Sequence, residues 1–401
     1  MRPTSTRARG RQVAAAAVLV AALGVGLGGC GAELPLPFEA PEGAIPPDSS
    51  YQVVDVWSHG QDGADLLGIR DILITQGSGS QLFMVFNQGG TGIAPRGRVN
   101  AYPFTRPTPI LGIDFPGVFS PVAIASDGDF VFVLDQGDTC LGRAEPTAGT
   151  CNVPGWTNRV TNYDAYWRVR RYGLLGGLSD ANDSVSTFTD TTMAYVQGIA
   201  ADDQGRVYVS GTAIIYIVDP DDSRFRTRTF QFRVYRYVPV PRFLGDAPPD
   251  RNMPDSFWRR DSTWVAEEGS GLGTLIDPRG LFWSGVGGPA LYATDFGKSV
   301  VQKLSVHLPS AGFYALDGAE SGQPFAGPTD VAVDLAGFVY GLDPGSRRVL
   351  RFDPRGTYVQ VVNFRGQEGD TLTDPVTAAV NDSMVYVGDG AGKVIRYRRR
   401  F

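Results

Sequence analysis

Short apolar runs with alternating polar positions recur along almost the whole chain after residue 50. Residues 328–363, PTDVAVDLAGFVYGLDPGSRRVLRFDPRGTYVQVVN, contain four such runs and three turns within 36 residues. Val, Ile, Tyr and Phe dominate the runs, and 51 glycines and 28 prolines supply the turns. This pattern is typical of antiparallel β-strands, and no amphipathic helix of more than three turns interrupts it. The chain is therefore predicted to be all-β.

The same unit of three or four strands can be aligned six times along the chain. In chain order the units are IRDILI, LFMVFN and GRVNAY; PVAIASDGDFVFVLD and WRVRRY; VQGIAADDQGRVYVSG and FRVYRY; DPRGLFWS, ALYATD and SVVQKLS; PTDVAVDLAGFVYGLD and RRVLRFD; and DPVTAAVNDSMVYVGD and KVIRYR. The sixth unit has three strands, so its fourth strand must come from elsewhere. Residues 51–60, YQVVDVWSHG, are similar to residues 357–366, TYVQVVNFRG, and are expected to supply it beside KVIRYRRR.

These units resemble NHL repeats, in which an apolar strand, an Asp-x-x-Gly turn, a strand ending in Ala-Asp and a further strand follow one another. The fifth and third units match best, whereas the first unit lacks the Asp-x-x-Gly turn and the fourth has SGVGGP in its place. The resemblance implies a six-bladed β-propeller of four-stranded antiparallel blades, because radial repetition leaves only short protected sheet edges. The N-terminal strand would close the last blade, so residues 51–401 would form one domain.

The first 29 residues have the features of an export signal, since four arginines precede the apolar run VAAAAVLVAALGVGLGG. The run ends in LGGC, which resembles the bacterial lipobox and implies cleavage before Cys30 and its modification by diacylglycerol and an acyl chain such as palmitate. The alternative is an uncleaved membrane helix from Val13, but 17 residues are short for a span. Residues 30–50 are rich in proline and are expected to form an extended tether.

Two or more acyl chains anchor a protein stably, so a membrane is the first expected partner. The mature protein should be a lipoprotein on the extracytoplasmic side of the cell envelope. In a cell with two membranes it would face the periplasm or belong to the outer membrane, because Gly31 is not the aspartate that usually signals inner-membrane retention.

The charge of the chain argues against nucleic acid as a partner, and its cysteines predict a disulfide. The net charge is −6 and becomes more negative once the leader arginines are removed, so nucleic acid is not an expected partner. Cys140 and Cys151 remain as an even pair within one polar loop of an exported protein, which predicts a disulfide. Zinc is a poor alternative there, because His59 and His307 are the only histidines of the chain.

Three long insertions, residues 136–165, 173–195 and 239–276, interrupt the repeats. In a meander of strands a, b, c and d, numbered outward from the axis, the b–c and d–a connections emerge at one end and the a–b and c–d turns at the other. We expect all three insertions at the b–c and d–a end, which we call the upper face; the opposite end is the lower face. Long loops on a rigid scaffold often carry binding sites, so the upper face is the predicted site.

Acidic or amide side chains end the second strand of most units. Converging carboxylates at this position suggest a cation or a basic ligand. The alternative is structural, because an aspartate that opens a turn accepts local backbone N–H bonds, and turn chemistry explains why the position recurs. The residues concerned are Asn87, Asp135, Asp295, Asp343 and Asp389.

The starts of the inner strands surround the predicted channel mouth and carry Asp71, Gln197, Arg279 and Asp330. Gluconolactonase-like propellers hold a divalent metal at this place with Glu, Asn and Asp side chains. Two aspartates and a glutamine here leave a metal-dependent envelope hydrolase or lactonase as an alternative, although the arginine would repel the ion. The repeats resemble propeller lyases of the peptide-amidating type as well, but two histidines cannot build their histidine-rich zinc site.

Residues 255–271, DSFWRRDSTWVAEEGSG, contain residue types that dominate interface energetics. They are Trp258, Arg259, Arg260, Trp264, Glu267 and Glu268. Alternatively, the tryptophans only anchor a long loop. The strands WRVRRY, FRVYRY and VIRYRRR alternate aromatic residues with arginine, and this alternation predicts buried aromatics and solvated arginines.

No G-x-S-x-G, H-E-x-x-H, Walker A or two-cysteine metal motif occurs. The leading hypothesis is therefore a lipid-anchored propeller that binds a protein or small ligand through its upper face, with no cofactor expected and no catalysis required. The alternatives are the metal-dependent hydrolase and a structural part of a larger surface assembly.

Overall fold

The computed structural model describes residues 51–58, 66–75, 81–87, 97–113, 115–118, 120–136, 167–175, 187–190, 192–218, 226–239, 258–308, 312–363, 372–381 and 383–400. The chain divides into two compact units, residues 1–46 and 47–401, and every described residue belongs to the second. Within the described residues, no helix combines the length and apolar character needed to cross a bilayer.

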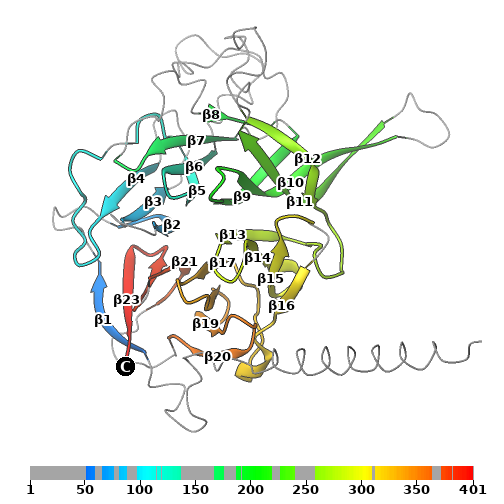
Figure 1. Ribbon diagram of the computed structural model, residues 1–401. Helices are drawn as coiled ribbons and strands as arrows, with labels where there is room; N and C mark the ends of the chain where they lie inside the picture. Colours follow the sequence, from blue (N-terminus) through cyan, green and yellow to red (C-terminus); the bar gives the residue numbers. More distant parts are fainter. Residues whose placement is uncertain are drawn as a thin grey trace, which may run out of the picture. The chain divides into compact units, whose positions relative to one another are not determined.

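The described strands form six antiparallel sheets, which we call blades and which surround a common axis (Figure 1). Blade 1 contains β2 (Ile69–Ile74), β3 (Leu82–Asn87) and β4 (Gly97–Tyr102). Blade 2 contains β5 (Pro121–Ser126), β6 (Phe130–Gln136), β7 (Trp167–Gly173) and β8 (Thr187–Phe188). Blade 3 contains β9 (Met193–Ala201), β10 (Val207–Val218), β11 (Arg226–Pro239) and β12 (Trp258–Ala266).

The other three blades come from the C-terminal half. Blade 4 contains β13 (Pro278–Ser284), β14 (Ala290–Asp295), β15 (Val300–Ser305) and β16 (Gly312–Leu316). Blade 5 contains β17 (Asp330–Val333), β18 (Val339–Asp343), β19 (Arg348–Phe352) and β20 (Tyr358–Val361). Blade 6 contains β21 (Pro375–Val380), β22 (Met384–Asp389), β23 (Lys393–Arg399) and β1 (Tyr51–Trp57). Two 3₁₀ turns, η3 (Phe296–Lys298) and η4 (Ala319–Ser321), complete the described elements.

The predicted six-bladed propeller is confirmed, with one local difference. Five described sheets have four strands, whereas blade 1 has three. At the fourth position of blade 1, the Ile110 N–H donates to the Ala101 carbonyl of β4 at 2.8 Å, so a non-strand segment covers part of that edge.

The N-terminal strand closes the ring as the sequence predicts. β1 pairs antiparallel with β23, from Tyr51 opposite Arg399 to Trp57 opposite Val394. The Trp57 side chain is buried, and the Arg396 guanidinium lies 5.0 Å from its ring centroid. Blade 6 therefore joins the two ends of the described chain, which lie side by side in Figure 1.

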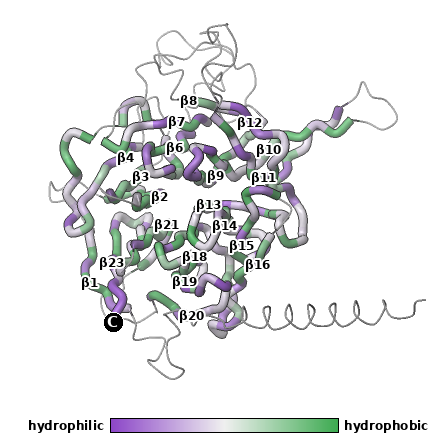
Figure 2. Tube along the Cα trace, viewed as in Figure 1, coloured by the Kyte–Doolittle hydropathy of each residue, from purple (hydrophilic) through white to green (hydrophobic). Residues whose placement is uncertain are grey.

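The core consists of six apolar clusters, each formed by residues of two neighbouring blades. Apolar positions are dense along β18, β19 and β21 and alternate with hydrophilic ones along the projecting part of β10 and β11 (Figure 2). Each middle strand thus packs a neighbouring blade on both of its faces. Burial of apolar surface on this scale is the main stabilising contribution to the fold.

The predicted solvation of the third-strand arginines holds at the end of β23, for Arg398 and Arg400, but is wrong for several arginines inside the blades. Arg168, Arg170, Arg236, Arg351 and Arg396 are all buried. The prediction fails because both faces of a third strand are covered, so alternation along the strand only selects which neighbouring blade a side chain meets. Each such arginine needs a partner inside the core, since an unpaired buried charge is strongly unfavourable.

Aromatic residues of the second strands and cations of the third strands form a row that recurs from blade to blade. An aromatic residue of the second strand lies opposite a cation of the third strand in five blades: Phe132 and Arg171, Tyr208 and Arg236, Tyr292 and Lys303, Tyr340 and Arg351, and Tyr386 and Arg396. In blade 6 the Arg396 guanidinium also pairs with Asp55 of β1 at 3.1 Å. In blade 3 Arg236 Nε donates to Asp261 Oδ2 at 3.0 Å. In blades 4, 5 and 6 the cation also lies over the ring opposite it, with Lys303 5.5 Å from Tyr292, Arg351 5.8 Å from Tyr340 and Arg396 5.6 Å from Tyr386.

The placement of two long insertions differs from the prediction. Residues 176–186 and 240–257 lie outside the described residues, but the flanking strands show that each connects a third strand to a fourth, β7 to β8 and β11 to β12. These connections belong to the lower face. The outer strands β8 and β12 are short or polar and were not recognised, so the insertions were assigned to d–a connections.

Candidate functional site

A cavity of about 440 Å³ lies on the axis at the upper ends of the inner strands. All six blades contribute to it, and its wall has both polar and apolar parts. Its lining includes Ile72, Ile124, Ile199, Leu281, Phe282, Val331 and Ala379. A second cavity of about 220 Å³ lies nearer the a–b turns and shares part of this apolar lining.

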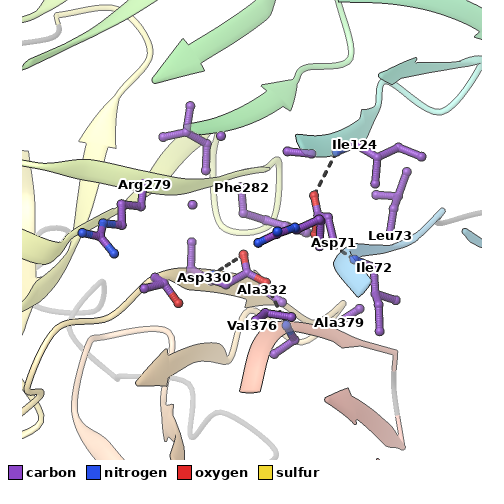
Figure 3. A pocket seen from close by; sticks show the side chains of 18 of the residues that line it. Asp71, Ile72, Leu73, Ile124, Arg279, Phe282, Asp330, Ala332, Val376 and Ala379 are labelled. Atoms are coloured by element: carbon purple, nitrogen blue, oxygen red, sulfur yellow. Dashed lines mark hydrogen bonds between the residues drawn. The ribbon is translucent and has the colours of Figure 1, made fainter. Parts of the chain in front are cut away.

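The four predicted channel-mouth residues all line the upper cavity, so the inner strands bring them together as expected. Asp71 and Asp330 lie near each other, while the Arg279 side chain extends away from them (Figure 3). The Arg279 guanidinium pairs with Asp277 at 3.0 Å and lies 3.5 Å from the Phe296 ring centroid. Gln197 Nε2 donates to Asp277 Oδ1 at 3.4 Å. The cavity mouth therefore has two separate polar groups: the carboxylates of Asp71 and Asp330, and the side chains of Arg279 and Gln197 that contact Asp277.

The Asp71 carboxylate is fully engaged with neighbouring strands. Its Oδ1 accepts the Ile72 N–H at 2.8 Å and the Thr377 hydroxyl at 3.0 Å, and its Oδ2 accepts the Ile124 N–H at 2.9 Å. Ile124 belongs to blade 2 and Thr377 to blade 6, so one side chain joins three blades. This arrangement is that of a structural acceptor.

Asp330 has the same role two blades earlier in the ring. Its Oδ1 accepts the Val331 N–H at 2.8 Å, and its Oδ2 accepts the Ala378 N–H of blade 6 at 2.8 Å. Each carboxylate therefore supplies acceptors for backbone groups that would otherwise lie unpaired between two inner strands.

Burial raises the pKa of both carboxyl groups. The pKa of Asp71 lies well above its ordinary value because of desolvation and then because of the Asp330 charge; the Ile124 and Ile72 N–H groups and the Thr377 hydroxyl lower it. Desolvation raises the pKa of Asp330 to about 6, against its hydrogen bonds from Ala378, Thr377 and Val331. Such pairs favour sharing of a proton near neutral pH.

Hydrogen bonds at the other blade junctions complete a ring around the axis. The Gln136 amide donates to the Val196 carbonyl at 3.3 Å, the Ser210 hydroxyl to the Arg279 carbonyl at 2.6 Å, and the Gly280 N–H to the Thr329 carbonyl at 2.9 Å. Sequence reasoning missed these donors because nothing in a single repeat marks a contact to the next one. The glycine at position 198 is one sequence feature that marks such a contact, because a Cβ there would lie 2.1 Å from the Arg279 carbonyl oxygen of the next blade.

The second-strand carboxylates do not line the cavity. Asp135, Asp295, Asp343 and Asp389 have no exposed surface. Each accepts a backbone N–H from the segment that enters the first strand of its own blade; the donors are Ser120, Asp277, Ala326 and Thr373. Asn87 donates to the Ser120 hydroxyl at 2.9 Å. These contacts support the structural interpretation of the position, although the donors lie before the first strand and not only in the b–c turn.

The segment expected to expose aromatic residues is the outer strand of blade 3. Trp258 and Trp264 are buried. Trp258 stacks on Phe188 at 5.0 Å, and Trp264 meets Tyr208 edge-on at 5.0 Å. Arg259 and Arg260 are exposed but lie where β12 begins, at the lower end. The tryptophans therefore join core clusters, and the arginines do not belong to the upper face.

The upper face carries instead an arm that the sequence did not indicate. β10 and β11 continue beyond their neighbours β9 and β12, and the extension projects from the ring (Figure 1). Tyr216, Ile217, Val218 and Phe230 are exposed on it, at 46–59% of their full accessibility. Arg228 lies 5.0 Å from the Phe230 ring centroid. Exposed apolar side chains grouped in this way are typical of interaction surfaces.

Three predicted residues fall outside the described residues. They are Cys30, expected to be lipidated, and Cys140 and Cys151, expected to form a disulfide. The b–c insertion of blade 2, residues 137–166, lies outside them as well, between Gln136 of β6 and Trp167 of β7.

Comparisons with known proteins show only distant similarity. No protein-family model matches the chain, and no curated protein matches it. A structural genomics protein of unknown function from Bacteroides thetaiotaomicron is similar in structure, with a TM-score of 0.48 and 14% identity over 87% of this chain and 75% of that one. Virginiamycin B lyase from Staphylococcus aureus has a TM-score of 0.45 and 8% identity over 87% of this chain and 100% of the lyase. A catalytically inactive form of that lyase with quinupristin gives 0.43 and 8% identity over 86% and 99%. The β-propeller assignment rests on the strand arrangement of the chain itself.

Proposed function

We propose that this chain is a lipid-anchored, extracytoplasmic propeller of the NHL-repeat type that binds a protein partner through its upper face. The observation that carries the proposal is the exposed arm of β10 and β11 at the same end as the upper cavity. The arm buries little apolar surface against its own blade, so it contributes little to the stability of the fold. Its apolar side chains fit the central part of a protein interface.

The alternative, a metal-dependent hydrolase at the channel mouth, has less support. Among the described residues, no group of three or more His, Cys, Asp or Glu side chains could hold an ion. Both mouth carboxylates already accept backbone N–H bonds, which occupy oxygens that a divalent cation would need. The residues at the mouth therefore do not fit the metal site of gluconolactonase-like propellers.

The arm gives a direct test of the binding function. A photo-crosslinking amino acid at Tyr216 should form an adduct with an envelope protein in the native cells. The same group at Phe313, which is equally exposed but lies on the outer strand β16, should not. Equal adduct yields at the two positions, or none at Tyr216, would contradict the assignment of the upper face.

The anchor and the metal alternative have their own measurements. Labelled fatty acid should enter the intact chain and not the Cys30→Ser variant; absence of label in the intact chain would refute the anchor. Metal analysis of the purified protein should find no divalent ion in stoichiometric amount. The hydrolase would instead require such an ion and its loss in an Asp71→Asn or Asp330→Asn variant. Such an ion would favour the hydrolase.

A further inference from the structure

The preceding segment enters the propeller at a cluster of arginines. Residue 50 is bonded to Tyr51, which lies opposite Arg399 at the lower end of blade 6, and Gln52 lies opposite Arg398. Arg400 Nε donates to Gln52 Oε1 at 3.0 Å, which holds the next arginine along the chain at the same place. The first residues of β1 and the basic end of β23 therefore form one corner of the lower face.

Two arginines of this corner, Arg398 and Arg400, are available to a partner. Arg398 and Arg400 are exposed and Arg399 is partly exposed. Within the part of the chain that the structure describes, no ion pair joins Arg398 or Arg400 to a carboxylate. Arg396, two residues earlier, differs, because it is buried between Trp57 and Tyr386 and pairs with Asp55. Arg396, Arg398 and Arg400 lie on the same side of the chain. Neighbouring side chains cover Arg396, whereas Arg398 and Arg400 lie at the exposed end of β23.

We propose that Arg398 and Arg400 contact anionic phospholipid headgroups as a second membrane contact beside the acyl anchor. This inference rests on the proposed function in one respect, namely that the segment before Tyr51 carries the lipid. A lipid at Cys30 keeps the blade 6 corner within reach of the bilayer, because only residues 31–50 separate the two. We choose anionic headgroups as the partner because the arginines lie near the tether and carry the opposite charge.

Electrostatics favours this corner over the rest of the propeller. The chain as a whole is acidic, at −6, so an anionic membrane repels its body. A local basic cluster beside the tether is then the part that approaches the surface, and each arginine near anionic lipid strengthens binding by about fivefold. The lower face would turn toward the bilayer, and the arm on the upper face would turn away from it.

The test uses the unmodified, full-length protein purified from its own membranes. The protein is incorporated into vesicles of phosphatidylcholine, or of phosphatidylcholine with 30% phosphatidylglycerol, and treated with an arginine-specific dicarbonyl reagent. Peptide mass spectrometry then gives the modification rate of each arginine. Arg226 and Arg228 serve as internal controls, because they are exposed on the arm of the upper face.

We expect the modification rates of Arg398 and Arg400 to fall at least fivefold in the anionic vesicles relative to the neutral ones. The rates of Arg226 and Arg228 should stay unchanged, and 0.5 M salt should restore the rates at the corner. Equal rates at Arg398 and Arg400 in the two kinds of vesicle would overturn the proposal, as would protection of Arg226 and Arg228 to the same degree. Fatty-acid labelling of Cys30 is measured on the same preparation, so loss of the anchor is distinguished from loss of the headgroup contact.

Discussion

One tyrosine hydroxyl joins side chains that are distant in the sequence. Tyr340 Oη lies 3.0 Å from Asp334 Oδ2, to which it donates, and accepts from Arg351 Nε at 3.1 Å. The hydroxyl of Tyr51, on the closing strand, lies 3.1 Å away. All four residues are buried, so loss of this hydroxyl would leave Asp334 Oδ2 and Arg351 Nε without the hydrogen bonds given above. The third-strand arginine is therefore retained inside the core by the aromatic residue beside it.

The Tyr340→Phe variant measures the value of this hydroxyl. Removing the oxygen leaves a buried carboxylate oxygen and a buried guanidinium without their hydrogen bonds. The free energy of unfolding should fall by about 2–3 kcal/mol. Chemical denaturation checks this, with Tyr216→Phe on the exposed arm as the matched control, for which a change within about 0.5 kcal/mol is expected. A loss no larger than the control's would contradict the proposed role.

The Asp71 and Asp330 pair makes stability depend on pH in an unusual direction. The pKa of Asp330 is raised from 3.8 to about 6 in the folded state, so the folded protein holds a proton that the unfolded chain releases. This contribution to stability is fully present below about pH 4 and is lost as the pH rises through about 6. The raised pKa of Asp71 acts in the same direction.

Unfolding experiments between pH 4.5 and 7.5 test this linkage. The free energy of unfolding contributed by the pair should decrease by roughly 1–3 kcal/mol over that range. Asp330→Asn should flatten the dependence, because it removes one titrating group and also the charge that raises the pKa of Asp71. Asp203→Asn, at an exposed turn position, should leave the slope unchanged. An unaltered slope in the Asp330 variant would show that the pair does not titrate as described.

At the scale of elements, most strands were predictable, including the outer strands β1 and β20, whereas β8, β12 and β16 were not. IRDILI, LFMVFN, GRVNAY and ALYATD coincide with β2, β3, β4 and β14, because strands buried on both faces are apolar and end at clear turns. The outer strands β8 and β16 have only two and five residues, so they lack that signal. The position of the channel-mouth residues could be predicted from the order of the strands alone. The hydrogen bonds between neighbouring blades could not be predicted, because no single repeat marks its contacts with the next one.

The closing strand is the element with the clearest mutational test. Trp57→Ala removes a side chain packed against Tyr386 at 6.0 Å and against Arg396. The resulting cavity and the loss of the cation–π contact should lower the free energy of unfolding by about 3–5 kcal/mol. Gln52→Ala, on the same strand, should cost less than about 1 kcal/mol because its hydrogen bond to Arg400 is exposed. Comparable losses in both variants would mean that Trp57 does not anchor the strand.

At the scale of the whole molecule, blade 6 is the only one of the six described sheets that combines strands from both ends of the sequence. The Asp55 and Arg396 pair spans 341 positions, whereas the other blades form from consecutive strands. The lower ends of β23 and β1 are adjacent, so a short turn could join them as a c–d turn joins strands elsewhere in the ring. The propeller is thus open to circular permutation.

A permuted chain tests the contribution of this long-range pairing to folding speed. Its new ends would lie in residues 59–65, and a short linker would join Arg400 to Tyr51. The six sheets should remain, while refolding accelerates several-fold because every blade becomes local in sequence. Stopped-flow refolding of the permuted chain and of residues 51–401 in natural order gives the comparison. Slower refolding with unchanged stability would contradict the expectation.

The same closure has a consequence for biosynthesis. A ribosome makes β1 first and β23 last, so the earliest strand must wait for nearly all of the polypeptide before its edge is covered. A partially synthesised chain therefore lacks the strand pairing that closes the ring. Maturation would end in a single late event, the docking of the oldest strand against the youngest.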